Sequence, residues 1–436
     1  MPKLRGIISF FLGLLVGTAF ALIAYQLGAR SEPKMAQRLV RRSALLEDEN
    51  ERLRRLLTAA ERATALAANK AQRDAVEKEV VAIRGLAFKQ PVDYQVLNRP
   101  QIKETIAKKL SELFSEQEFR HMTTALALLG LLPENYPLRE KYIDLLGEQV
   151  AAFYDQHQHK LFMFEDASLE SAQNRVVLAH ELTHALQDQH FGLKRLPLEI
   201  KTNDDRALAA GALVEGEATL VMSEFMLKNL SLETLKDNLA ATLTQNMEQL
   251  SKAPRFLRET LMFPYLRGQE FCAAIFGRGG YAAISKAYER PPSSSAQILH
   301  PEKYLLDPRE EPLEIAWADL TWNGRPAIVD NVVGEFGVRV LVSEWVDSAA
   351  GEKAARGWRG DRYLCMEEGP ALVWKSRWSS AADADEFLAA MTQVMANRPD
   401  RAQRAQRLNK PDATSVVLID ALDASAADAL AERFAR

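Results

Sequence analysis

The stretch Val176–Phe191, VVLAHELTHALQDQHF, decides the fold and the chemistry expected of this chain. It holds His180, Glu181 and His184 in the pattern His-Glu-x-x-His. Apolar residues flank the pattern at helical spacing, which predicts an α-helix with a buried face. Residues four apart on a helix are one turn apart and about 40° apart around the axis, so both imidazoles face the same side.

These side chains match the needs of a catalytic zinc site. Such a site uses neutral imidazole ligands, an open coordination position, and a carboxylate that takes a proton from bound water. We therefore expect His180 and His184 to bind one Zn²⁺ and Glu181 to act as the general base. The alternative is a helix that carries two core or surface histidines.

A third ligand is required, and His190 is the first candidate. It follows His184 by six residues, which is the metzincin spacing, but Gln187 stands where that pattern has a helix-breaking glycine. On an unbroken helix His190 lies about 9 Å further along the axis. It would then be too far away to reach the ion.

The second candidate segment is Leu213–Ala218, in which Glu215 and Glu217 stand within an apolar run. A buried carboxylate is costly unless it is paired or binds a metal. We expect Glu215 to be the third ligand. The alternatives are Glu217 as the ligand, or a partly solvated helix face without a metal.

Around the motif, the pattern predicts mostly helices. Two short apolar runs, Val150–Tyr154 and Lys160–Phe164, flank a polar turn and predict a β-hairpin. Ile102–Leu132 predicts two amphipathic helices, and helical segments from Arg206 continue to about residue 290. A Pro/Ser run, Pro291–Ser295, marks a boundary.

From Leu313 onward the pattern changes to a small α+β domain. We expect strands at Arg362–Glu367, Ala371–Trp378 and Val416–Ile419, and a helix at Ala381–Met395. The predicted fold class is therefore α+β and mainly helical. The predicted regions are a tip and transmembrane anchor, a long helix, a metallopeptidase-like domain and the α+β domain, at residues 1–30, 31–84, 85–312 and 313–436.

Ile7–Leu27 is an uncharged run of 21 residues. On a helix it would span the hydrocarbon layer of about 30 Å, so we expect a transmembrane anchor; a cleaved signal peptide is the alternative. The basic residues after the span favour a cytoplasmic body, whereas the short basic N-terminus resembles an export signal. We predict a single-pass protein of a bacterial inner membrane with an extracytoplasmic catalytic domain.

Residues 35–84 lack Pro and Gly and are rich in Ala, Leu, Glu and Arg, which predicts a long helix. Asn50 stands at a core position of an imperfect heptad repeat, a place where Asn favours dimers. The interpretations are a homodimer through residues 35–71 or a lone helix packed on the body. The repeat is carried by Leu39, Leu46, Leu53, Ala60 and Ala67.

Composition excludes other classes of protein. The net charge of −4 argues against a nucleic-acid partner. The two cysteines, Cys272 and Cys365, are too few for a zinc ribbon or an Fe–S site, each of which needs about four thiolates. Whether they pair with each other stays open.

The motifs together resemble the gluzincins, the zinc metallopeptidase clan of thermolysin and aminopeptidase N. In that clan a second helix supplies a Glu ligand, and Glu215-Gly216-Glu217-Ala218 matches the aminopeptidase form with Glu215 in the ligand place. Pro264-Tyr265-Leu266-Arg267-Gly268 is similar to a segment whose Tyr stabilises the oxyanion, which implies that role for Tyr265. Its alternative is a packing tyrosine.

The resemblance covers about residues 145–305. It implies that Lys160–Phe164 is an edge strand that holds the substrate backbone. More closely, the chain resembles bacterial HExxH proteins without an assigned substrate. It departs from thermolysin in the longer interval between His184 and Glu215 and in Thr219, which stands where thermolysin has an Asp that supports a ligand. It also lacks the exopeptidase motif of the aminopeptidases.

The predicted function is that of a membrane-anchored zinc-dependent peptidase, an endopeptidase, acting on peptide or protein substrates. His180, His184 and Glu215 would hold the zinc, while Glu181 and Tyr265 would act in catalysis. The alternative is a catalytically silent zinc-binding scaffold or adaptor at the membrane. An intact Glu181 argues against the scaffold, because a structural zinc site needs no base.

Overall fold

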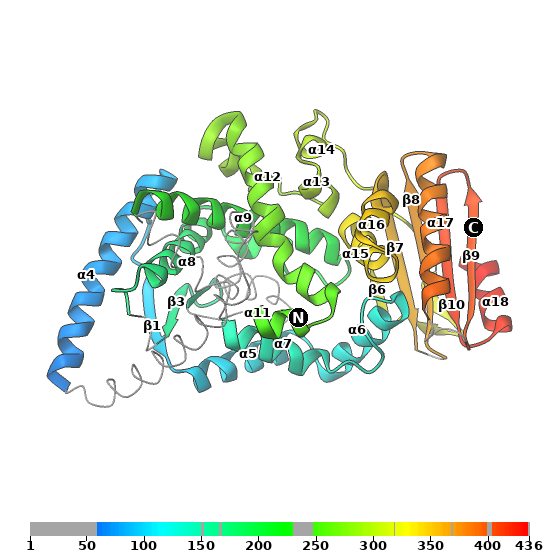
Figure 1. The fold of residues 1–436 in the computed structure, drawn as a ribbon, viewed down its shortest axis with the longest axis horizontal. Helices are drawn as coiled ribbons and strands as arrows, with labels where there is room; N and C mark the ends of the chain where they lie inside the picture. Colours follow the sequence, from blue (N-terminus) through cyan, green and yellow to red (C-terminus); the bar gives the residue numbers. More distant parts are fainter. Residues whose placement is uncertain are drawn as a thin grey trace, which may run out of the picture.

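The computed structural model describes residues 59–149, 152–164, 168–229, 247–317, 319–367, 369–398 and 403–434. It is an α+β structure in which helices predominate, as the sequence predicted. A helical part holds the His-Glu-x-x-His segment. A sheet of late strands lies at the opposite end of the molecule, orange to red in Figure 1.

Most of the helical part is built from long helices joined by short loops (Figure 1). The two helices expected within Ile102–Leu132 are present as α5 and α6, and the helix over residues 35–84 is confirmed for residues 59–84. The helices of this part are α4 (Ala59–Arg84), α5 (Arg99–Leu113), α6 (Glu116–Leu129), α7 (Leu138–Gln149), α8 (Ala172–Phe191), the 3₁₀ turn η2 (Leu193–Arg195), α9 (Asp204–Asn229), α11 (Met247–Lys252), α12 (Arg255–Ala287), α13 (Ser295–Leu299) and α14 (Pro301–Leu305).

A three-stranded sheet packs against α8. Its strands are β1 (Asp93–Leu97), β2 (Ala152–Asp155) and β3 (Lys160–Phe164), in the order β1-β3-β2. The β2–β3 hairpin is antiparallel, as predicted. However, β3 also pairs in parallel with β1, so the Lys160–Phe164 strand is central and not an edge. The local pattern could not reveal this, because β1 comes from a distant segment.

The carboxyl-terminal sheet has five strands in the order β6-β7-β8-β10-β9, with antiparallel neighbours. Alternate residues of its strands face α15 and α17 on one side and α18 on the other, so both faces are buried. The elements of this part are β4 (Thr321–Trp322), β5 (Arg325–Pro326), β6 (Val329–Asn331), α15 (Gly334–Trp345), α16 (Ser348–Ala355), β7 (Trp358–Met366), β8 (Ala371–Trp378), α17 (Ala381–Asn397), β9 (Ala405–Asp412), β10 (Ser415–Ala421) and α18 (Ala424–Phe434).

One hydrophobic core is shared by the two parts. Leu213 of α9 and Phe263 of α12 belong to the same cluster as residues of α15 and of the five-stranded sheet. The rings of Phe263 and Phe336 lie 4.3 Å apart between centroids. Asp205 of α9 accepts the backbone N–H of Ser295 in α13, and Ser295 Oγ accepts the backbone N–H of Phe336 in α15, so these bonds also join the two parts.

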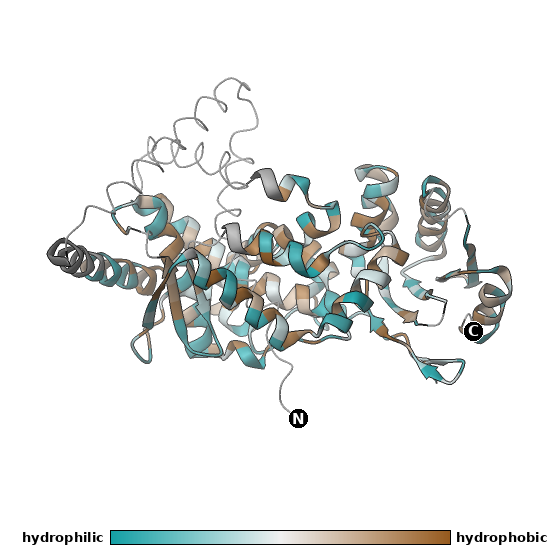
Figure 2. Ribbon diagram, turned by 90° about the horizontal axis from the view of Figure 1, so that it is seen from below, coloured by the Kyte–Doolittle hydropathy of each residue, from teal (hydrophilic) through white to brown (hydrophobic). Residues whose placement is uncertain are grey.

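Within the described residues, no helix is both long and apolar enough to cross a membrane. The longest of them, α12, has 33 residues but carries charged side chains, and Figure 2 shows hydrophilic and hydrophobic residues mixed along the helices. The part of the chain that the structure describes therefore contradicts the prediction of a single-pass membrane protein. The segment on which that prediction rested, Ile7–Leu27, lies outside the described residues, as do the heptad positions before residue 59.

Candidate metal centre

Helix α8 carries three of the predicted site residues in the interior of the protein. His180 and Glu181 have no exposed surface, and His184 is only 3 % exposed. Helices α4 and α9 and the strands β2 and β3 surround α8, which explains why residues 176–188 are all buried. The helix ends at Gly192, whose left-handed φ of 68° allows the chain to turn away.

Two glycines of the sequence motifs set the distance between α9 and α12. A Cβ on Gly216 would collide with the carbonyl oxygen of Gly268, and one on Gly268 would collide with the carbonyl oxygen of Ala212. The helices therefore cross in backbone contact, which only glycine allows. This crossing brings Glu215, the neighbour of Gly216, and Tyr265, one turn before Gly268, to the same cavity.

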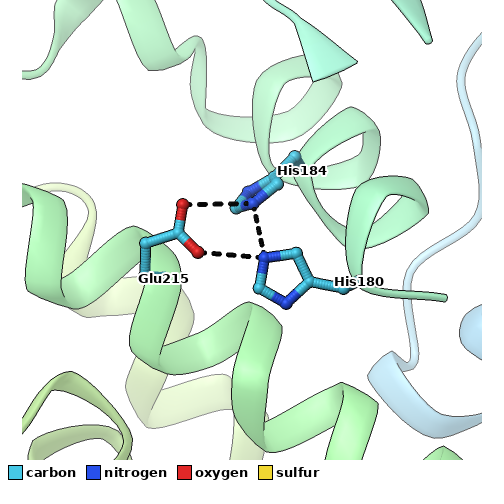
Figure 3. A group of neighbouring side chains, drawn as sticks. All are labelled: His180, His184 and Glu215. Atoms are coloured by element: carbon cyan, nitrogen blue, oxygen red, sulfur yellow. Dashed lines mark hydrogen bonds and ion pairs between the residues drawn. The ribbon is translucent and has the colours of Figure 1, made fainter. Parts of the chain in front are cut away.

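Three side chains converge at the centre of the site (Figure 3). His180 Nε2 lies 2.9 Å from Glu215 Oε2, and His184 Nε2 lies 3.4 Å from Glu215 Oε1. The two Nε2 atoms are 2.9 Å apart. These residues form a group that could hold a metal ion, since one ligand atom from each lies within 4.8 Å of the others.

The three groups shift one another's pKa values. Burial favours neutral Glu215, but the imidazoles of His184 and His180 outweigh it and lower the pKa of Glu215. Burial opposes the charged form of His184, yet Glu215 and Glu181 raise its pKa to about 9. For His180, burial has the larger effect and lowers the pKa, although Glu215 opposes this shift. An ionised carboxylate thus faces two buried imidazoles.

Glu181 is held beside these groups by β2. Its Oε2 accepts the backbone N–H of Tyr154 at 2.8 Å. Its Oε1 is buried and has no hydrogen-bond partner among the described residues. Burial raises the pKa of Glu181 well above its usual value, and Glu215 adds to this while His184 opposes it. The carboxylate is therefore fixed through one oxygen and has the other available for a proton.

Tyr265 lies on α12, buried against the centre, and its ring stacks on that of His180 at 6.1 Å. It lines a cavity of ≈ 190 Å³ that also reaches Glu215. The cavity walls are mostly apolar side chains of α5, α6, α12 and α15. Asp204 and Asp205 belong to its few charged lining residues.

The other candidate ligands lie elsewhere. His190 Nε2 is 2.7 Å from the carbonyl oxygen of Ala87, away from the centre. Glu217 is fully buried, but it forms an ion pair with Arg84 of α4. Cys272 and Cys365 are both buried and unpaired with each other, which closes the question of a disulfide.

Two residues at this site were not singled out as functional from the sequence. Gln187 accepts a hydrogen bond from His184 Nδ1 at 2.8 Å, and Arg84 pairs with Glu217. The spacing of three residues between His184 and Gln187 was a usable signal, because such residues share a helix face. No local pattern points to Arg84, which lies 133 residues before Glu217.

Comparison with known proteins covers only the carboxyl-terminal part. Residues 325–430 match a family model described as a domain of unknown function, DUF8575. This range contains the five-stranded sheet with α15, α16 and α17 and lies outside the metal centre. No curated protein and no solved structure matches the chain significantly.

Proposed function

We propose that this chain is a zinc-dependent peptidase that hydrolyses peptide bonds through a metal-activated water. One observation carries the proposal. Two imidazole nitrogens and a carboxylate from a second helix converge on one point, and the unpartnered Oε1 of Glu181 belongs to the residue next to His180. A structural zinc site has four protein ligands, whereas three ligands plus a base is the catalytic arrangement.

The donor set suits zinc. Two nitrogens and one carboxylate oxygen are the ligands of many catalytic zinc sites, and the buried setting protects them from competing water. A bound Zn²⁺ would act as a Lewis acid and would lower the pKa of a coordinated water to about 7. His180, His184 and Glu215 would hold it. The arrangement of a second-helix Glu supports the gluzincin-like core that the sequence predicted.

The chain's own residues would supply proton transfer and charge stabilisation. Glu181 takes a proton from the attacking water at Oε1, while the N–H of Tyr154 keeps Oε2 in place. The same carboxyl group then gives the proton to the leaving amine. Tyr265, stacked on His180, donates its hydroxyl proton in a hydrogen bond to the oxygen that gains negative charge.

The residues around the site favour one class of substrate. The cavity beside Glu215 and Tyr265 is mostly apolar, which favours a peptide with a bulky apolar side chain next to the cleaved bond. β2 is the edge strand of the three-stranded sheet, but its residues are buried and the N–H of Tyr154 already donates to Glu181, so no peptide backbone is assigned to it. β3 has partners on both sides and offers no free edge.

The decisive experiment compares wild type with Glu181→Gln. Wild type should purify with about one zinc per chain and cleave members of a peptide library. Glu181→Gln should keep the zinc, because Glu181 is not a ligand, and should lose roughly 10²–10⁴-fold in hydrolysis. Zinc binding without cleavage, and no effect of Glu181→Gln, would favour the silent scaffold. No zinc in wild type would refute both.

A further inference from the structure

A buried polar network lies beneath His184, on the side away from the cavity. It runs from His184 through Gln187 of the same helix to Glu217 of α9 and Arg84 at the end of α4. All four residues are at most 3 % exposed. None of Gln187, Glu217 and Arg84 lines the cavity. The proposed reaction leaves these three residues without a role.

The orientation of the Gln187 amide is determined by its acceptors. Its Nε2 lies 2.9 Å from the carbonyl oxygen of Val214 and 2.9 Å from Glu217 Oε2. A carbonyl and a paired carboxylate can only accept, so the NH₂ group must face them. The carbonyl oxygen Oε1 must then face His184, because a flipped amide would place this oxygen against two other acceptors, Val214 O and Glu217 Oε2, and lose both bonds.

This orientation selects the tautomer of His184. Because Gln187 Oε1 accepts at 2.8 Å, Nδ1 of His184 must carry the proton. The lone pair of the neutral ring is then on Nε2, the atom that faces Glu215 and His180. His180 has no such support: its Nδ1 is buried without a partner in the described part of the chain, and so is Thr219 Oγ1.

The far end of the network is neutralised by α4. Arg84 Nε donates to Glu217 Oε1, and its Nη2 donates to Ser285 Oγ at 2.9 Å. Tyr288 donates its hydroxyl to Glu217 Oε2 at 2.5 Å. A buried carboxylate without a cation would be costly, so the ion pair with Arg84 stabilises Glu217 in its place as the acceptor for Gln187.

We propose that Gln187, Glu217 and Arg84 form a positioning relay that holds His184 as a metal ligand through Nε2, and that α4 thereby supports the metal centre. Gln187 touches the ligand, and the other two act through it. The relay rests on the proposed metal site. Hydrogen-bonded partners of ligating histidines orient the ring and raise its affinity for the metal.

The first test measures the zinc affinity of the full-length chain by competition with a chelator. Gln187→Leu removes the acceptor of His184 Nδ1 and should weaken zinc binding by roughly 10–100-fold. The matched control is Gln189→Leu on the same helix, because the Gln189 side chain accepts from the Lys89 and Gln90 amides and donates to the carbonyl of Gln90, away from the metal centre. It should bind zinc as wild type does.

A single and a double variant test the relay without changing Gln187 itself. In Glu217→Gln the new NH₂ group must face either the Arg84 donor or the Gln187 donor. Two donors then oppose each other, one hydrogen bond of the relay is lost, and zinc binding weakens. In Arg84→Met with Glu217→Gln, the NH₂ group turns to the place that Arg84 left. The orientation of Gln187 is then restored, and zinc affinity should return close to wild type.

The absorption spectrum of the Co²⁺-loaded chain gives a second readout, because it reports ligand geometry. It should change in Gln187→Leu and in Glu217→Gln, and the spectrum of the double variant should be close to that of wild type. Equal zinc affinity and spectrum in wild type and Gln187→Leu would overturn the relay alone. So would a double variant that binds as weakly as Glu217→Gln. A wild-type chain that binds no zinc would overturn the proposed function and the relay with it.

Discussion

The two sides of the metal centre differ in the polarity of the residues that form them. Toward α4, the centre rests on Gln187, Glu217 and Arg84, which are joined by a hydrogen bond and an ion pair. Toward α5 and α6, it borders a cavity of ≈ 190 Å³ with mostly apolar walls. Helices α9 and α12 contribute residues to both surroundings.

The difference follows from what each side must do. Ligands need a fixed orientation, and a buried polar group gives it only when all its partners are present. A space for a substrate persists only where the lining groups need no partner, which apolar side chains satisfy. The comparison therefore separates residues that set metal affinity from residues that set substrate choice, and the following variants test this separation.

The largest effect is expected at Glu215, where the two sides meet. Glu215→Ala removes a ligand and leaves two imidazoles, so the purified chain should contain no zinc when analysed by mass spectrometry. His190→Ala is the control and should keep the metal, because its imidazole bonds to Ala87. The reverse result would identify a metzincin-like site and overturn the assignment.

Tyr265→Phe comes next and should act on turnover alone. Loss of a hydroxyl that stabilises the oxyanion should lower kcat by roughly 10²–10³-fold, with zinc content unchanged. Tyr142→Phe, which lines the same cavity from α7, serves as the control. Steady-state kinetics with equal kcat for Tyr265→Phe and wild type would identify Tyr265 as a packing residue.

Met122→Trp tests the apolar side by filling the cavity from α6. For peptides with a bulky apolar side chain, kcat/KM should fall by roughly 10–200-fold, the scale of discrimination by an apolar pocket. Peptides with alanine there should lose less, and zinc affinity should not change. Met122→Leu keeps the volume and should behave as wild type. An equal loss of kcat/KM for all peptides would show that the cavity does not determine substrate choice.

The smallest effect is expected at Asp205, a carboxyl group at the cavity wall. Burial, together with Asp361 and Glu335, raises its pKa to about 8, against the hydrogen bonds from Ser295. Between about pH 4 and pH 8 the folded chain keeps a proton that the unfolded chain has lost, so the free energy of unfolding decreases as pH rises.

Asp205→Asn removes this titration while its amide oxygen can still accept from Ser295. In thermal unfolding, Tm should fall less between pH 5 and pH 9 in the variant than in wild type. Equal falls would show that Asp205 ionises in the folded chain as freely as in the unfolded one.

Much of the local structure could be predicted from the sequence. The Val176–Phe191 helix, the helices on either side of Ser115, and the hairpin around His157 all follow from spacing and from short polar breaks. The same holds for the strands Ala371–Trp378 and Ser415–Ala421, although β6, β9, α15 and α16 were not anticipated. β6 and α16 are short and β9 is largely exposed, so they carry weak periodicity, and the glycines and valines of α15 have a low preference for helix.

The sequence by itself determined which residues can share a helix face. His180, Glu181 and His184 are close because of helical geometry, whatever the rest of the chain does. The same reasoning limited the third ligand to a few candidates, and the unbroken helix removed His190 from the centre.

Only the tertiary structure decided between Glu215 and Glu217. They stand two residues apart on α9, equally buried, and helical geometry points them about 160° apart. Which one faces the histidines depends on how α9 lies against α8, and that is set by the contact of Gly216 with Gly268 and by Arg84 on the opposite side. These contacts join segments that are far apart in the chain. The spacing of residues within one helix gives no information about how that helix packs against a distant one.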